Sequence, residues 1–149
     1  MIAVEEAQTL CLEGLSALPV ETLPLVHAGG RILARKERAT RAQPPFASSA
    51  MDGYAVRSED VTPGARLSVV GEAPAGHAWG GTLAHGEALR IFTGAPLPRG
   101  ADRVVIQEDT SRDGDMITVT GDPGDNLNVR PQGADFPAGF ELAAPRRLG

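Results

Sequence analysis

The chain has 149 residues, enough for one domain or for one domain with a small appendage. Its formal net charge of −5 gives no electrostatic footprint for nucleic acid, and the single cysteine, Cys11, excludes a disulfide within the chain. No apolar run approaches the roughly 20 residues of a membrane span, and acids rather than bases follow the first Met. The sequence therefore predicts a cytoplasmic protein with neither nucleic acid nor membrane among its partners.

Two helices are predicted at the start of the chain. Residues 3–18 show helical periodicity that ends at Pro19, and we expect the apolar stripe to pack as structural core. A second helix is predicted from residue 22 to Leu33, with Pro24 near its first turn and Gly29 and Gly30 weakening it. The stripe of the first helix consists of Ala7, Leu10, Cys11, Leu15 and Leu18.

Five basic residues follow between residues 31 and 41, with one acid among them. An anion site would fit such a cluster, but no aromatic residues interleave with the bases, so a solvated charged face is favoured. The bases are Arg31, Arg35, Lys36, Arg38 and Arg41.

Beyond residue 52 the apolar period changes from 3.6 to 2, which is typical of strands. Strands are predicted over residues 53–57, 66–70, 87–92, 103–107 and 116–120. The last two are expected to form a hairpin across Ser111–Asp115, because Asp113-Gly114 is a strong turn dipeptide. With 18 Gly and 12 Pro supplying turns, the fold class is mainly β with N-terminal helices (α+β), a barrel-like or bent sheet with one or two helices leading in.

Three polar residues lie in segments of small residues and are candidates for a site. Asp52 precedes Gly53 in the stiff stretch 44–56, Thr93 follows a predicted strand, and Asp135 follows two small residues. Two carboxylates and a hydroxyl would suit a hard cation such as magnesium. Residue types alone leave open that the acids are ordinary turn residues and that Thr93 is a cap, and spacing does not show that the three converge.

Other chemistries find little support. No phosphate-binding loop, nucleophile elbow or dinucleotide motif is present, and the three histidines share no metal-ligand spacing. The acids between residues 108 and 125 do not match a calcium-binding loop, so a hairpin turn explains Asp113 and Asp115 better.

Four motifs resemble those of the MoeA family, the molybdopterin molybdenumtransferases, which includes the matching part of gephyrin. They occur in the family's order, and the resemblance extends from the first helix to the last residue. The motifs are residues 49–57, 91–102, 104–109 and 128–135, which read SAMDGYAVR, IFTGAPLPRGAD, VVIQED and NVRPQGAD.

This resemblance implies the transfer of molybdenum from molybdate into adenylylated molybdopterin, assisted by Mg²⁺, with release of AMP. Asp52, Thr93 and Asp135 match the family's catalytic positions, and the two acids are then the candidates for binding metal. Ala134 stands where the family usually has Glu, which puts a further acid there in doubt. The implied substrate-binding residues are Ser49, Met51, Gly53 and Gly94.

The resemblance also implies a domain organisation. Residues 1–37 with 140–149 would form a small, elongated, partly helical linker and dimerisation region (domain I), and residues 38–139 a β domain that carries the motifs (domain II). The family continues into an α/β domain that holds the pterin, and its cleft forms across a homodimer, so this chain alone is expected to be inactive. The alternative is a non-catalytic assembly or dimerisation module of the same pathway.

Overall fold

The computed structural model describes residues 2–149, which form two compact units. One unit contains the residues up to Glu37 together with Leu142–Gly149, and the other contains Arg38–Glu141. Short strands make up most of the regular structure, and one α-helix lies near the start of the chain. The prediction of a mainly β fold with an N-terminal helix is therefore confirmed.

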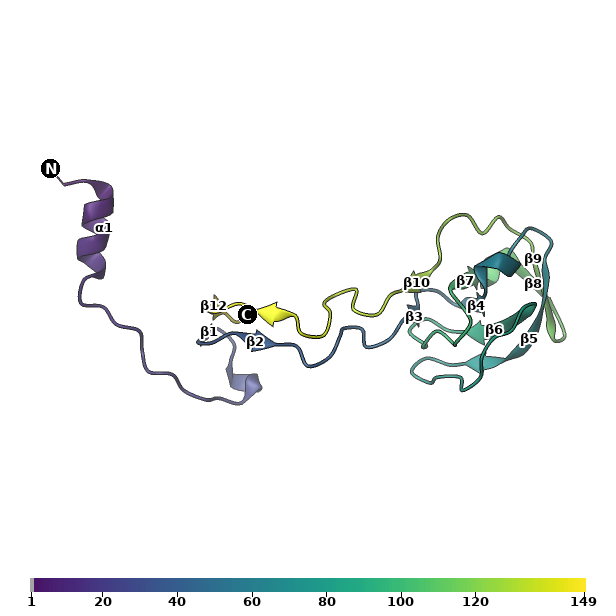
Figure 1. Cartoon of the computed structure of the whole chain (residues 1–149), viewed down its shortest axis with the longest axis horizontal. Coiled ribbons are helices and arrows are strands. Elements are labelled where there is room, and N and C mark those ends of the chain that lie inside the picture. Colours follow the sequence, from purple (N-terminus) through teal and green to yellow (C-terminus); the bar gives the residue numbers. More distant parts are fainter. Residues whose placement is uncertain (1) are drawn as a thin grey trace. The chain divides into compact units, whose positions relative to one another are not determined.

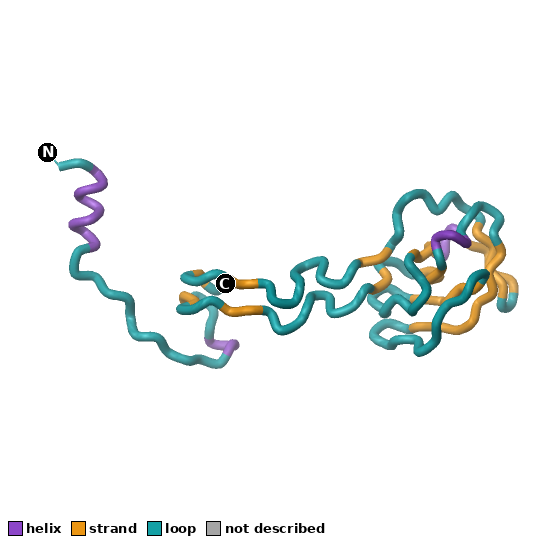
Figure 2. Tube along the Cα trace, viewed as in Figure 1, coloured by secondary structure: helices purple, strands orange, loops and turns teal. Residues whose placement is uncertain are grey.

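The first unit contains little regular structure (Figures 1 and 2). Helix α1 (Val4–Leu12) is followed by a long loop and a 3₁₀ turn, η1 (Leu25–His27). Strand β1 (Ile32–Leu33) pairs antiparallel with β12 (Arg146–Arg147). In residues 2–149 no helix is both long and apolar enough to cross a membrane.

The first predicted helix is shorter than expected and its apolar stripe is not packed. Helix α1 ends at Leu12, and Gly14 follows with a φ of +82°, a left-handed conformation typical of the residue after a helix. None of the residues of α1 is buried, and Leu10 remains 53% exposed. Among the described residues, the expected core packing of this stripe is therefore wrong.

The second predicted helix, over residues 22–33, is also wrong. Only the three residues of η1 are helical, and Gly30 then adopts a φ of +77°, which an α-helix does not accommodate. Ile32 and Leu33 belong instead to β1, and the neighbouring Arg31 carbonyl accepts a bond from Leu148 N–H at 2.8 Å. Their hydrogen-bond partners come from the far end of the sequence, which a local apolar pattern cannot reveal.

A six-stranded, curled sheet dominates the second unit (Figure 1). Its order is β7-β4-β6-β5-β9-β8, and every neighbouring pair is antiparallel except β5 and β6, which are parallel. Short 3₁₀ turns, η2 (Ser58–Asp60) and η3 (Gln107–Asp109), follow β4 and β7. The strands are β4 (Gly53–Val56), β5 (Arg66–Ala73), β6 (Glu87–Ile91), β7 (Arg103–Ile106), β8 (Thr110–Asp113) and β9 (Met116–Val119).

The predicted hairpin exists, but its first strand is a different segment. Residues 110–113 form β8 and pair with β9 in the register Asp113↔Met116, so that only Gly114 and Asp115 lie in the loop. A two-residue loop requires its strands to begin at once on either side, which excludes the predicted partner 103–107. That segment, β7, ends at η3 and pairs with β4 instead.

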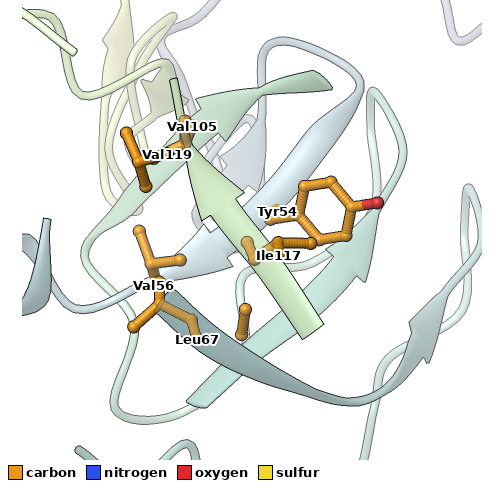
Figure 3. Packing of buried hydrophobic residues seen from close by; sticks show 7 residues of the cluster. Tyr54, Val56, Leu67, Val105, Ile117 and Val119 are labelled. Atoms are coloured by element: carbon orange, nitrogen blue, oxygen red, sulfur yellow. The ribbon is translucent and has the colours of Figure 1, made fainter. Parts of the chain in front are cut away.

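Strand β4 and its two neighbours, β6 and β7, have buried residues on both faces of the sheet. Because successive residues of a strand point to opposite faces, Tyr54 and Val56 of β4 join one apolar cluster, while Ala55 joins the other. Figure 3 shows the first cluster, in which Tyr54, Val56 and Ile117 lie together with other buried side chains. The second cluster includes Leu89 and residues from the neighbouring strands. Burial on both sides fixes the register of β4 and hence the position of the residue before it.

Two segments that are far apart in the sequence run side by side. Strand β3 (Ser48–Ser49) pairs antiparallel with β10 (Val129–Arg130), and β2 (Glu37–Arg38) forms a ladder with β11 (Glu141–Leu142). Between these ladders the Gln43 N–H donates to the Phe136 carbonyl at 2.9 Å. The chain therefore enters and leaves the β domain through adjacent segments.

Candidate functional site

The register of β4 and β6 brings Asp52 to Thr93. Gly53 pairs with Ile91 in this antiparallel ladder, so the residue before β4 and the residues after β6 lie next to each other. Asp52 Oδ1 accepts hydrogen bonds from the backbone N–H of Thr93 at 2.8 Å and from its hydroxyl at 2.7 Å. Two of the three predicted catalytic residues are thus in direct contact across 41 positions of sequence.

These bonds stabilise the charged form of Asp52. The backbone N–H of Thr93, followed by its hydroxyl, lowers the pKa of the Asp52 carboxyl, and the positive charge of Arg90 acts in the same direction. Both hydrogen bonds end on Oδ1, so Oδ2 keeps its capacity to accept a hydrogen bond or to bind a cation. Asp52 therefore presents a carboxylate, rather than a carboxylic acid, at neutral pH.

Gly53 has a steric reason to be glycine. A Cβ atom at this position would lie 2.0 Å from the carbonyl oxygen of Val105 in β7. Gly94, directly after Thr93, has a φ of +83°, where side chains are unfavourable. Both glycines therefore shape the backbone that holds the Asp52–Thr93 pair.

Ser49 and Met51 belong to the same cluster of loops. The buried Ser49 hydroxyl donates to the Met51 carbonyl at 2.5 Å, and the Ser49 carbonyl accepts from Gly94 N–H at 2.9 Å. Met51, in contrast, is 42% exposed beside Asp52. The structure therefore brings Ser49, Met51, Gly53 and Gly94 to the Asp52–Thr93 pair, and their predicted role in substrate binding stays a prediction.

Asp135 lies in a different set of contacts. Its Oδ1 accepts a hydrogen bond from Arg130 at 2.6 Å, and its backbone N–H donates to the Gln43 carbonyl at 2.9 Å. Arg130 is in β10, opposite Ser48 of β3. Asp135 is thus connected to the segment that leads to Asp52 through the β3–β10 ladder, while its carboxylate is engaged by Arg130.

Sequence reasoning missed two arginines that organise these acids, Arg130 and Arg90. Arg90 donates to the Gly53 carbonyl at 2.9 Å and to Gln107 Oε1 at 2.8 Å, and it lies over the ring of Phe92. A weak signal for Arg90 was present, because a charged residue between two buried apolar residues of a strand points to the other face. Nothing in the sequence marked the face on which Asp52 lies.

The donor set fits magnesium only in part. Asp52 Oδ2 could hold a hard cation together with water, whereas Asp135 Oδ1 is already paired with Arg130. A separate group, Glu59, Asp60 and His85, has ligand atoms within 4.8 Å of one another. Its side chains have protein partners, since Glu59 pairs with Arg57 and Asp60 contacts both His85 and the backbone N–H of Gly86.

Comparisons with known proteins agree with the motifs. Residues 2–148 match the family model described as the MoeA N-terminal region (domain I and II). The chain is 42% identical over 127 residues to a molybdopterin molybdenumtransferase of a Nostoc species, and this alignment covers 82% of the chain and 29% of the relative. It is 39% identical over 161 residues to molybdopterin molybdenumtransferase 2 of Mycobacterium tuberculosis, which covers all of the chain and 40% of the relative.

A solved structure shows the same fold. The crystal structure of the molybdopterin biosynthesis moeA protein from Pyrococcus horikoshii matches with a TM-score of 0.83 at 33% identity, covering 93% of this chain and 38% of that chain. The chain thus spans less than half the length of the relatives it matches. The family model covers nearly every residue, and the chain therefore belongs to the MoeA family, of which it matches the N-terminal region.

Proposed function

We propose that this chain supplies the part of a molybdenumtransferase site that faces the incoming oxyanion. The full protein would insert molybdate into adenylylated molybdopterin and release AMP, in the cytoplasm and as a homodimer. The observation that carries the proposal is the bonded pair of Asp52 and Thr93, placed on glycine-supported loops at the ends of two core strands. The names of the relatives support the reaction class, namely a role in molybdenum cofactor biosynthesis.

The charge state of Asp52 limits what it can do. An ionised carboxylate can accept a proton or bind a cation, but it repels a free anion such as molybdate. When bound at Asp52 Oδ2, Mg²⁺ would neutralise this charge and supply water molecules that an oxyanion can replace. The Thr93 hydroxyl donates a hydrogen bond to Asp52. The lone pairs of the hydroxyl oxygen can therefore accept a hydrogen bond from bound water or from substrate.

Asp135 would have a supporting part. Arg130 binds the carboxylate of Asp135, so this ion pair places one positive and one negative charge beside the β3–β10 ladder. An incoming phosphate could compete with Asp135 for the guanidinium, which is well suited to oxyanions. Asp135 would then control how tightly Arg130 holds that phosphate.

The test is steady-state release of AMP by the full-length protein with adenylylated molybdopterin, molybdate and Mg²⁺. We expect Asp52→Asn, which keeps the shape but removes the charge, to lower kcat by about 100-fold or more. Thr93→Val should have a smaller effect in the same direction. Asp113→Asn, at the last residue of β8, is the matched control and should keep wild-type rates. Wild-type rates in Asp52→Asn would contradict the proposal.

One observation favours the alternative, a non-catalytic assembly or dimerisation module. Helix α1 buries none of its residues, although Val4, Leu10 and Leu12 are apolar. Sedimentation of this chain with and without Leu10→Glu would detect self-association through that helix. Turnover by the isolated chain, without any added subunit, would refute the assembly role, whereas we expect none because the chain matches only the N-terminal region of the family.

A further inference from the structure

The guanidinium of Arg90 makes two hydrogen bonds and lies against two aromatic rings. It donates to the Gly53 carbonyl at 2.9 Å and to Gln107 Oε1 at 2.8 Å. Its Cζ atom also lies 4.4 Å from the ring centre of Phe92 and 5.3 Å from that of Tyr54, both within the range of cation–π contact. A long and otherwise flexible side chain is thus confined to a single position.

The point of attachment distinguishes Arg90 from Arg130. Arg130 binds the carboxylate of Asp135 directly and occupies one of its oxygens. Arg90 binds the backbone carbonyl of the residue after Asp52, so its charge acts on that carboxylate while leaving both oxygens to Thr93 and to incoming groups.

Gln107 completes the support of this turn. Its side chain accepts from Arg90, and its backbone N–H donates to the Asp52 carbonyl at 3.1 Å. The two consecutive carbonyls of Asp52 and Gly53 are therefore both held, one by the backbone of Gln107 and the other by Arg90. Fixed carbonyls fix the peptide planes on both sides of Gly53, and the first of these planes includes the Cα atom that carries the Asp52 side chain.

We propose that Arg90 is the positioning residue of the Asp52–Thr93 pair, because it fixes the Gly53 carbonyl and the side chain of Gln107, whose backbone N–H in turn holds the Asp52 carbonyl. Its importance for catalysis rests on the proposed function, but its effect on the Asp52 carboxylate does not. An arginine is required, because lysine has neither the planar fork that bonds two acceptors at once nor the flat face that stacks on a ring.

Hydrogen exchange on the 149-residue chain tests this inference without any enzyme assay. It is followed at the amides of Thr93 and Gln107, which donate to Asp52. The Gly86 amide donates to a carboxylate elsewhere, that of Asp60, and is the internal control.

In Arg90→Gln we expect the Thr93 and Gln107 amides to exchange at least about tenfold faster, with Gly86 unchanged. Arg90→Lys keeps the charge but not the two simultaneous hydrogen bonds, so exchange at both amides should still accelerate. The control is Arg112→Gln in the edge strand β8, which removes an equal charge and a bond to the backbone carbonyl of Gly114 in the β8–β9 loop. It should change exchange at neither amide.

Exchange within about twofold of wild type at both amides, in Arg90→Gln and in Arg90→Lys, would overturn the inference. If Arg90→Gln does not fold, Phe92→Leu replaces it: the charge remains, one ring contact is lost, and the same two amides should exchange faster. In the full-length protein Arg90→Lys should lower kcat more than it raises KM. An inactive wild type would refute the proposed function and leave the exchange results to decide on Arg90.

Discussion

Gly53 gives the sharpest test of how the site is built into the sheet. In Gly53→Ala the new Cβ would lie 2.0 Å from the Val105 carbonyl oxygen and 2.9 Å from its carbon. Carbon and oxygen atoms that are not bonded to each other approach to roughly 3.3 Å, so β4 and β7 would have to separate by about 1.3 Å. The three atoms nearest to the new Cβ are backbone atoms of Val105 and Ile106, which cannot move aside as a flexible side chain can.

The cost follows from these distances. Forcing an extra methyl into a packed position costs about 1–3 kcal/mol, and weakening one hydrogen bond of the β4–β7 ladder adds about 1 kcal/mol. We therefore expect Gly53→Ala to lower the free energy of unfolding by about 2–4 kcal/mol. For a domain of about 100 residues each kcal/mol corresponds to about 4–8 °C, so Tm should fall by about 10 °C or more.

Thermal unfolding followed by circular dichroism measures this change. The matched control is Gly80→Ala in the same unit, where a Cβ would meet nothing within 4 Å and φ is not in the left-handed region. Removing backbone freedom from the unfolded chain should leave that variant neutral or slightly more stable. If the two variants melt within about 2 °C of each other, the close approach of β4 and β7 does not limit this position.

Three further outcomes are expected. Ile117→Ala, at a side chain with no exposed surface, should lower the free energy of unfolding in urea by about 2–5 kcal/mol without changing the m-value; a loss below about 1 kcal/mol would contradict the packing of its cluster. The pKa of Asp52 is lower in the folded than in the unfolded state, so its contribution to stability is present above the unfolded pKa and is lost as pH falls through the folded pKa. Asp52→Asn should thus be less stable than wild type at neutral pH, and the two unfolding curves should converge in acid; a constant difference at every pH would argue against the Thr93 bonds. The exposed thiol of Cys11 should react with Ellman's reagent as fast in buffer as in denaturant, and strong protection in buffer would show that α1 is covered in solution.

The β domain could be predicted from the sequence because its strands have short-range patterns. The alternation around Leu89 and Ile91 identifies β6, and Asp113-Gly114 identifies a hairpin turn, since both signals lie within a few residues of the structure they specify. The partner of each strand is not specified in this way. The local pattern therefore predicts β7 as the first strand of the hairpin, although β7 pairs with β4.

The wrong helix prediction near the N-terminus has the same cause, namely pairing with a distant part of the chain. The apolar residues of 22–33 suit a helix, but Ile32 and Leu33 pair with Arg146 and Arg147, more than a hundred residues away. The candidate site is a similar case. Spacing does not show that Asp52 meets Thr93, because this contact depends on the β4–β6 register, which is fixed by burial on both faces of the sheet.

The paired segments at the entrance of the β domain have a consequence for how this protein can be altered. The Ala39 N–H donates to the Phe140 carbonyl at 2.9 Å, so the two ends of the domain are close enough to be joined by about two residues. A domain whose ends are adjacent can be excised, circularly permuted or inserted into a loop of an unrelated host with little strain on its strands. The Asp52–Thr93 pair, Arg90 and Arg130 can therefore be moved into a host protein together, within one domain.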